Sequence, residues 1–448
     1  MIKKKPADAR EAAAFTLFAM AEDGAWSDGA LHHFLERARL SERDAALAAR
    51  LAYGTLQNRS MCDFYLSNYS KIRLSKIAPR VLDVLRMTAY QLTMLDRIPA
   101  HAAVGEAINL IRKYCRADPR TVGFANGVLR AIARDSEAGL LPRLDCPDKE
   151  SYYALRYSHP EWFIRYLSEQ FGQKEAERIA AANNEAAPLS VRVNRLQLTP
   201  NTAAERLAAD GFAVTPHETM ENILLCSGGD ITAHPLFQEG KITVQDAASA
   251  ACVEVLNPQP GAKTLDCCAA PGGKTFYIAE RMENTGEVVS CDVYEHKLEI
   301  IRAGAGRLGL SNIKTRLADG RVRQDQLAGS ADYVLCDAPC SGLGIIRKKP
   351  EIRFKTDAEL AGLPAIQAAI LGNCCGYVKP GGTLVYSTCT VLKRENEDVV
   401  GGFLAEHPEF SLEPFTHPVC GDTEGMITLL PHRNQTDGFF IAKLRRTQ

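Results

Sequence analysis

The 448-residue sequence lacks the features that mark several common classes of protein. No apolar run reaches the ~20 residues of a membrane-spanning helix, so we expect no membrane association. Asp8, Arg10 and Glu11 interrupt the amino-terminal stretch, which favours an amphipathic first helix over an export signal. We therefore expect a cytoplasmic protein.

The 14 cysteines include no CxxC spacing, and histidine partners at metal-ligand intervals are missing as well. We therefore expect no bound metal. Most of the thiols are predicted to be small core residues in a reducing compartment.

The sequence also lacks a complete nucleotide-binding loop. The stretch "LDCCAAPGGKT", residues 265–275, ends as a phosphate loop does, but Cys268 stands where the GxxxxGK template has its first glycine. Cysteine disfavours the positive φ angles that this glycine adopts, and Pro271 has no amide hydrogen. A dinucleotide loop is excluded too, because GxGxxG is absent. The stretch is predicted to bind a different ligand.

Composition and length indicate a globular chain of two or three domains, with 46% hydrophobic and 24% charged residues. The net charge of -1 hides an asymmetry. Residues 1–140 hold 21 lysines and arginines against 15 aspartates and glutamates, so they carry a surplus of six positive charges and the remainder carries -7. A basic amino-terminal part favours a polyanionic partner.

Residues 8 to about 138 follow a helical pattern and predict an all-α unit. The segment at 78–95 places apolar residues three and four apart, as the buried face of a helix requires. These residues are Val81, Leu82, Leu85, Ala89 and Leu92. Basic residues gather near the end of the unit, where they form either a solvated helix face or a nucleic-acid surface: Arg112, Lys113, Arg116, Arg120, Arg130 and Arg134.

Two further segments follow a proline- and glycine-containing linker at 138–148. The first predicts a small α+β module, with a strand that carries Val191, Val193, Leu196 and Leu198 and a short helix after it. The second alternates strand-like and helical runs, which indicates a parallel sheet with helices on both faces. Its tail predicts an antiparallel pair of strands that closes the sheet.

Acidic residues follow successive strands of the predicted parallel sheet. Ligands of such sheets lie beyond the carboxyl ends of the strands. The first strand ends in the glycine-containing loop, the second near Asp292 and the third at Asp319. Either aspartate alone is as well explained as a helix cap, but both together favour a nucleoside with a positive charge over a phosphate-rich cofactor. S-adenosylmethionine is such a molecule.

Cysteines follow the next two predicted strands. Cys340 and Cys389 come after polar or turn-forming residues, whereas packing cysteines lie within apolar runs. A thiolate can add to C6 of a pyrimidine and make C5 able to accept a methyl group from a sulfonium. Asp337 could stabilise the ring through N3 and the exocyclic amine, or it could simply cap a turn. The base must be unstacked, so an RNA loop or a flipped nucleotide is the expected target.

With these residues in view, the chain resembles the RNA 5-methylcytosine methyltransferases of the Sun and nucleolar-protein family. The resemblance is strongest in "AAPGGK" at 269–274, "DAPCSG" at 337–342 and "STCT" at 387–390. It extends through "VQDAASA" and "RYSHPEWF" into the first helices. There, "FANGVLRAI" at 124–132 resembles the NusB fold, an RNA-binding helical bundle.

The resemblance implies a multidomain chain. It comprises an all-α NusB-like RNA-binding bundle over residues 1–142, a linker and small α+β (RRM-like) module over 143–236, and an α/β Rossmann-like class I methyltransferase domain over 237–448. The implied activity is S-adenosylmethionine-dependent methylation of C5 of a cytosine in small-subunit (16S) ribosomal RNA, through a covalent cysteine–C6 intermediate. The expected partner is this RNA or an assembling small subunit, and the expected oligomeric state is a monomer.

The family also implies roles for individual residues. Cys389 is the expected nucleophile, Cys340 assists release of the methylated RNA, and Asp337 and Lys274 complete the catalytic set, with Lys274 orienting Asp337. The implied cofactor-binding residues are Cys268, Ala269, Ala270, Pro271, Gly272, Gly273, Lys274, Asp292, Asp319 and Asp337. Cys267 beside Cys268 departs from the commoner single cysteine and is interpreted as a packing residue.

Three alternatives remain open. DNA cytosine methyltransferases take their nucleophile from a Pro-Cys pair, which here is Pro339-Cys340 and would exchange the roles of the two cysteines. The same chemistry could act on transfer RNA. A chain of this kind could also be an RNA-binding assembly factor with an idle catalytic centre.

Overall fold

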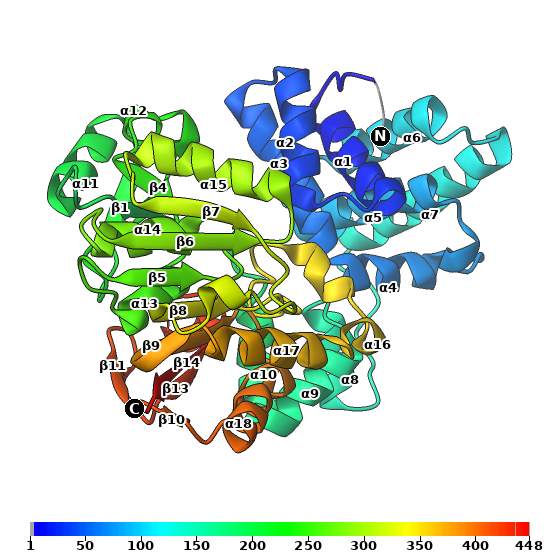
Figure 1. Ribbon diagram of the computed structural model, residues 1–448. Coiled ribbons are helices and arrows are strands. Elements are labelled where there is room, and N and C mark those ends of the chain that lie inside the picture. Colours follow the sequence, from blue (N-terminus) through cyan, green and yellow to red (C-terminus); the bar gives the residue numbers. More distant parts are fainter. Residues whose placement is uncertain (1–3, 435, 448) are drawn as a thin grey trace. The chain divides into compact units, whose positions relative to one another are not determined.

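The computed structural model describes residues 4–434 and 436–447, which fall into two compact units (Figure 1). The first unit extends to Glu185 and includes Ile346–Asp357, and the second comprises Ala186–Ile345 and the chain from Ala358 onward. No helix within the described residues is long and apolar enough to cross a membrane. The domain boundaries predicted after residues 142 and 236 stay predictions.

The first unit is helical. Its helices are α1 (Ala9–Asp23), α2 (Ser27–Ala38), α3 (Glu42–Gln57), α4 (Arg59–Tyr69), α5 (Pro79–Met94), α6 (Ala100–Tyr114), α7 (Pro119–Glu137), α8 (Lys149–Arg156), α9 (Glu161–Phe171) and α10 (Gln173–Ala182). The predicted all-α segment therefore corresponds to α1–α7. The predicted linker is the coil between α7 and α8.

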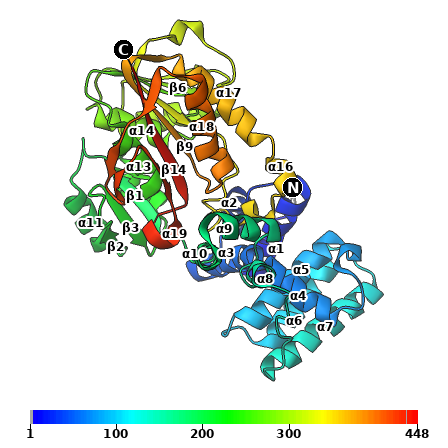
Figure 2. The same cartoon turned by 90° about the horizontal axis from the view of Figure 1, so that it is seen from below.

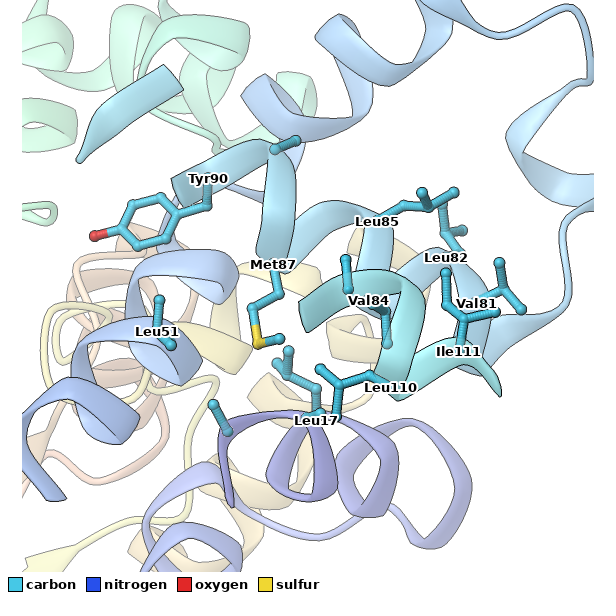
Figure 3. Packing of buried hydrophobic residues seen from close by; sticks show 14 of the residues in the cluster. Leu17, Leu51, Val81, Leu82, Val84, Leu85, Met87, Tyr90, Leu110 and Ile111 are labelled. Atoms are coloured by element: carbon cyan, nitrogen blue, oxygen red, sulfur yellow. The ribbon is translucent and has the colours of Figure 1, made fainter. Parts of the chain in front are cut away.

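Helix α5 lies at the centre of this helical core. Its residues are buried almost all round, as expected of a helix packed on several sides. Of the five apolar residues predicted to be buried on it, four are at most 9% exposed and Leu92 is partly buried. Figure 3 shows Val84 and Met87 of α5 among Leu17 of α1 and Leu110 of α6, which belong to the same cluster. The core therefore joins helices that are far apart in sequence.

A buried arginine fixes the segment Ile346–Asp357 within the first unit. Arg353, 1% exposed, donates hydrogen bonds to the carbonyl of Gln57 at 2.6 Å and to the side-chain oxygen of Asn184 at 3.0 Å. Carbonyls of Ser158 and Asn183 accept further bonds. These acceptors lie at or just beyond the ends of α3, α8 and α10, where unpaired carbonyls and the helix dipole attract a cation. The buried charge is thus balanced by helix termini.

We predict that Arg353→Met destabilises the first unit by about 3–5 kcal/mol, because it leaves several buried carbonyls without a donor. Both tryptophans, Trp26 and Trp162, belong to this unit, so urea unfolding followed by tryptophan fluorescence reports on it. The matched control is the exposed Arg43→Ala, which should change stability by at most about 0.5 kcal/mol. Equal effects of the two variants would contradict the anchoring role.

The second unit begins with a small four-stranded sheet of order β2-β3-β1-β4, all antiparallel pairs. Its elements are β1 (Leu189–Val193), α11 (Pro200–Ala209), β2 (Ala213–Pro216), β3 (Ile223–Ser227), α12 (Pro235–Gln238) and β4 (Ile242–Val244). The strand predicted to reach Leu198 ends earlier, at Val193. It ends there because Asn194 accepts the amide of Leu196 with its side chain and that of Leu198 with its carbonyl, which turns the chain.

A larger sheet follows, in the order β10-β14-β9-β8-β5-β6-β7, and β13 pairs with β14. Strands β5 to β9 are parallel, and the tail forms the predicted antiparallel pair. The elements are α13 (Ala247–Leu256), β5 (Lys263–Asp266), α14 (Gly273–Arg281), β6 (Glu287–Asp292), α15 (Glu295–Leu308), β7 (Ile313–Leu317), β8 (Ala331–Asp337), α16 (Asp357–Leu360), α17 (Leu363–Cys375), β9 (Val378–Thr388), α18 (Glu397–Glu406), β10 (Phe410–Leu412), β11 (Phe415–His417), β12 (Gly421–Thr423), β13 (Met426–Leu429), α19 (Pro431–Asn434) and β14 (Phe439–Arg446).

The two faces of the large sheet carry separate cores, as the alternation of side chains along a strand requires. Leu335 of β8 faces the cluster of α13, α14 and α15, whereas its neighbours Val334 and Cys336 face that of α17 and α18. Figure 2 shows α13 and α14 on one side of β9 and β14 and α17 and α18 on the other. The predicted doubly covered parallel sheet is confirmed.

A buried ion pair joins the small sheet to the large one. Arg192 of β1 is fully buried, pairs with Glu280 of α14 and donates to the side chain of Gln245 at 2.5 Å. Its guanidinium also lies over the ring of Tyr277. Because removing either charge would leave the other buried and unpaired, this contact strongly couples the two sheets.

Candidate active site at neighbouring strand ends

The register of β8 and β9 brings the two candidate cysteines together. Asp337 at the end of β8 pairs with Ser387 of β9, so Cys340 and Cys389 follow the strands by similar distances. Their sulfur atoms lie 3.2 Å apart, and both side chains are partly exposed. The sequence predicted that each cysteine follows a strand; the structure shows that the two strands are neighbours.

The contact between the sulfurs makes the two thiols unequal. The hydrogen bond between the two sulfurs lowers the pKa of Cys389 and raises that of Cys340. Burial opposes the lowering at Cys389 and reinforces the rise at Cys340. The thiolate, which is the nucleophilic form of cysteine, is therefore favoured at position 389.

Buried polar residues hold the loops that carry the cysteines. The Glu395 carboxylate accepts the amide of Ser341 at 2.9 Å and the side chain of Gln367 at 2.8 Å, and Gln367 also donates to the carbonyl of Pro339. The Gly344 amide donates to the Cys389 carbonyl at 2.9 Å. Both loops are thereby fixed by bonds that do not involve the sulfurs.

Asp337 lies between a lysine and a serine. The Lys274 ammonium and the Ser387 hydroxyl each donate to one of its carboxylate oxygens at 2.7 Å. Burial lowers the pKa of Lys274, but the attraction of Asp337 outweighs burial, and the pKa lies above its ordinary value. Lys274 therefore remains charged at neutral pH. The expected contact between Lys274 and Asp337 is present, whereas Ser387 as its third member was not predicted.

The loop Cys268–Lys274 connects β5 to α14. Gly272 has a φ of +110°, and a Cβ atom there would lie 2.6 Å from the ring of Phe276, so only glycine fits. Ala269 is buried, its amide donates to the carbonyl of Cys291, and Ala270 and Pro271 continue the turn. Burial raises the pKa of Cys268 well above its ordinary value, so this thiol is neutral.

A buried carboxyl group lies under this loop. Asp266, the last residue of β5, is 1% exposed and accepts the hydroxyl of Thr275 at 2.7 Å, and Ser290 donates to Thr275. Its other oxygen has no hydrogen-bond partner among the described residues. Burial raises the pKa of Asp266 to about 7. The group thus titrates near neutral pH.

The two predicted acidic residues of the next strands take different environments. Asp292, 7% exposed, ends β6 and accepts the amide of Tyr294 at 3.1 Å. Asp319 lies two residues beyond β7 and pairs with Arg321, and the hydrogen bonds from Arg321 lower the pKa of Asp319 to about 2. Both carboxylates therefore also stabilise local turns, as the capping interpretation allowed.

These residues meet where ligands of open α/β sheets bind. The chain first builds β5, β6 and β7 outward and then adds β8 and β9 on the other side of β5. The winding reverses between β5 and β8, and Asp266 and Asp337 end these two strands. Several carboxylates and a backbone opened by Gly272 suit a cationic nucleoside such as S-adenosylmethionine. In the described parts of the chain, no three His, Cys, Asp or Glu side chains are grouped to hold a metal.

The doubly covered parallel sheet and its acidic strand ends define a class I, S-adenosylmethionine-dependent methyltransferase domain. Three family matches extend this assignment to the rest of the chain. The family described as "16S rRNA methyltransferase RsmB/F" matches residues 253–445. The NusB family matches residues 7–134, and the ferredoxin-like domain of RsmF/B-like methyltransferases matches residues 159–232.

Related proteins span nearly the whole chain. "Probable ribosomal RNA small subunit methyltransferase B" of Bacillus subtilis (strain 168) is 35% identical over 99% of both chains. Ribosomal RNA small subunit methyltransferase B of Serratia proteamaculans (strain 568) is 34% identical over 90% of this chain and 91% of its own. The solved structure of PH0851 covers 99% of this chain and 100% of its own, with 27% identity and a TM-score of 0.85. The chain therefore belongs to the RsmB family of ribosomal RNA methyltransferases.

Several residues around the site were not predicted. Ser387 and Asp266 lie within quoted sequence motifs, and their positions at strand ends were a usable signal. Glu395 and Gln367 carry no such signal, because a glutamate and a glutamine in helical or polar stretches are ordinarily solvated. Only the fold shows that both are fully buried.

We predict that Asp266 makes the second unit less stable as pH rises. Its folded-state pKa of about 7 exceeds the unfolded value, so its favourable contribution is complete below about pH 4 and is lost as pH rises through 7. Between pH 5 and 8 the loss is about 2–3 kcal/mol. Hydrogen exchange of the β5 amides, compared with Asp266→Asn at the same pH, measures it.

The matched control for this titration is Asp319→Asn. The pKa of Asp319 is lowered to about 2, so its contribution to stability is constant between pH 5 and 8. If the difference between the native chain and Asp266→Asn is the same at both pH values, the titration of Asp266 near neutrality is contradicted.

Proposed function

We propose that this protein methylates C5 of a cytosine in 16S ribosomal RNA through a covalent bond between Cys389 and C6 of the base. The observation that carries the proposal is the pair of sulfurs 3.2 Å apart beside the Lys274–Asp337 hydrogen bond. Membership of the RsmB family and the activity for which its relatives are named support the choice of small-subunit ribosomal RNA.

In the proposed reaction, the Cys389 thiolate forms a bond to C6 of the cytosine. Asp337, held by Lys274 and Ser387, accepts hydrogen bonds from the exocyclic amine and from N3. N3 takes a proton from water as sulfur adds and gives it up when sulfur leaves, so the charge that develops on the ring is neutralised. S-adenosylmethionine supplies the methyl group, and the cofactor-binding residues are those of the loop Cys268–Lys274 with Asp292, Asp319 and Asp337. The C5 proton then leaves to a base, the bond from C6 to sulfur breaks, and Cys340 assists release.

The lowered pKa of Cys389 supports its role as the nucleophile over the alternative in which Pro339-Cys340 supplies it. Cys389→Ala should abolish methyl transfer, whereas Cys340→Ala should accumulate a protein–RNA adduct on a denaturing gel. Lys274→Ala should slow turnover with both cysteines intact. An active Cys389→Ala protein together with an adduct-free Cys340→Ala protein would reverse the assignment, and full turnover of Lys274→Ala would remove its orienting role.

Transfer RNA stays the alternative substrate. Bisulfite sequencing of total RNA from a strain without this gene should show one cytosine in 16S ribosomal RNA that has lost its methyl group, and complementation with the native chain should restore it. Loss of the mark from transfer RNA would instead establish the alternative. No change in either RNA, with no S-adenosylmethionine binding in calorimetry, would favour the non-catalytic assembly factor.

A further inference from the structure

A groove of about 810 Å³ runs between α6 and α7, which lie side by side in Figures 1 and 2. A short turn joins the two helices into an antiparallel pair. Each helix lines the groove with residues three and four positions apart, from Ala100 to Arg112 on α6 and from Pro119 to Glu137 on α7. All of these residues belong to the first unit.

Two glycines keep the groove open. Gly105 and Gly123 lie in helix interiors, where glycine is less stable than alanine. A Cβ atom at either position would meet no other atom within 4 Å, so packing does not require glycine there. The buried apolar floor is formed by Val104, Ile108 and Val122. The two glycines therefore leave room for an occupant to approach the helix backbones closely.

The sides of the groove are basic. Arg112, Arg130, Arg134 and His101 line it, against the carboxylate of Glu137, and Arg134 also pairs with Asp135 at 2.8 Å. Arg112 and Arg130 are exposed and form no hydrogen bond or ion pair with any residue that the structure describes. Of the six basic residues that the sequence grouped near the end of the helical unit, the structure thus places three in one groove.

We propose that this groove binds the phosphate backbone of a single-stranded RNA segment. Arg130 and Arg134 are one helical turn apart, about 6 Å along the axis, so they can contact neighbouring phosphates of one strand. The side-chain amides of Asn109 and Asn126, which also line the groove, offer donors and acceptors to riboses and base edges. The proposal rests on RNA being the substrate and adds a binding surface in the first unit, whereas the reactive cysteines belong to the second.

The lining favours RNA over an acidic protein segment. Protein interfaces concentrate aromatic and apolar anchors at their centre, and no aromatic side chain is among the described residues that line this groove. Without an aromatic platform for stacking, affinity must come from phosphate contacts. Binding by the groove is therefore expected to tolerate different sequences and to depend strongly on salt.

The test measures binding of the full-length protein to a short fluorescent single-stranded RNA by anisotropy, between about 50 and 200 mM salt. Arg112→Ala combined with Arg130→Ala should weaken binding about 10-fold or more and reduce the slope of log affinity against log salt by about 1.4, or 0.7 for each lost contact. Arg43→Ala, which removes an exposed arginine of α3, should change affinity less than about twofold. An equal loss of affinity in Arg43→Ala would contradict binding at the groove. It would show that RNA affinity depends on the overall positive charge and not on where the arginines lie.

A second variant tests the groove without changing charge. Gly123→Leu introduces a good helix former and fills the groove, so it should weaken RNA binding while leaving the salt slope within about 0.3 of the native value. With 16S ribosomal RNA, KM should rise in these variants and kcat should not change. Native RNA binding in both variants, or displacement of an acidic peptide but not of RNA, would overturn the proposal. If the native protein itself neither binds nor methylates RNA, the proposed function fails instead.

Discussion

The parallel pairing of β8 with β9 is the constraint on which the candidate site depends. It sets Asp337 opposite Ser387, and two close contacts of the site follow from that register: the bond between these two residues and the meeting of the two sulfurs. A shift of β8 by one residue would turn Asp337 to the opposite face of the sheet, away from Ser387 and Lys274. Hydrophobic cores on both faces oppose such a shift, because Val334 and Leu335 would exchange clusters.

The polar groups around this register are costly to bury, and hydrogen bonds partner most but not all of their polar atoms. Glu395 is fully buried and accepts the amide of Ser341 and the side chain of Gln367, which also donates to the carbonyl of Pro339, so these bonds hold the loop on both sides of Cys340. Glu395, Gln367 and Asp266 each leave one buried oxygen without a hydrogen-bond partner among the described residues. Unsatisfied buried groups of this kind mark places where stability is given up, and here they lie behind the Cys340 loop and at the strand end beside the cofactor loop.

Much of the fold could be predicted from local pattern. The spacing of apolar residues on α5, the alternation of strands and helices and the antiparallel pair of strands in the tail each depend on residues close in sequence, and the structure confirms them. The candidate site was predicted only as separate strand ends. The distance between the sulfurs depends on the pairing of strands some 50 residues apart, and the burial of Glu395 depends on α17, so neither has a local signal.

The segment Ile346–Asp357 was missed for the same reason. Basic side chains are ordinarily exposed, yet Arg353 is enclosed by the ends of three helices that precede it by more than 160 residues. The chain thus leaves the second unit shortly after Cys340 and re-enters it before α17. A shortened protein that begins at the small sheet would contain this segment without the helices that bury it. The two units therefore alternate along the sequence. Neither unit can be replaced by joining a different protein at a single point of the chain.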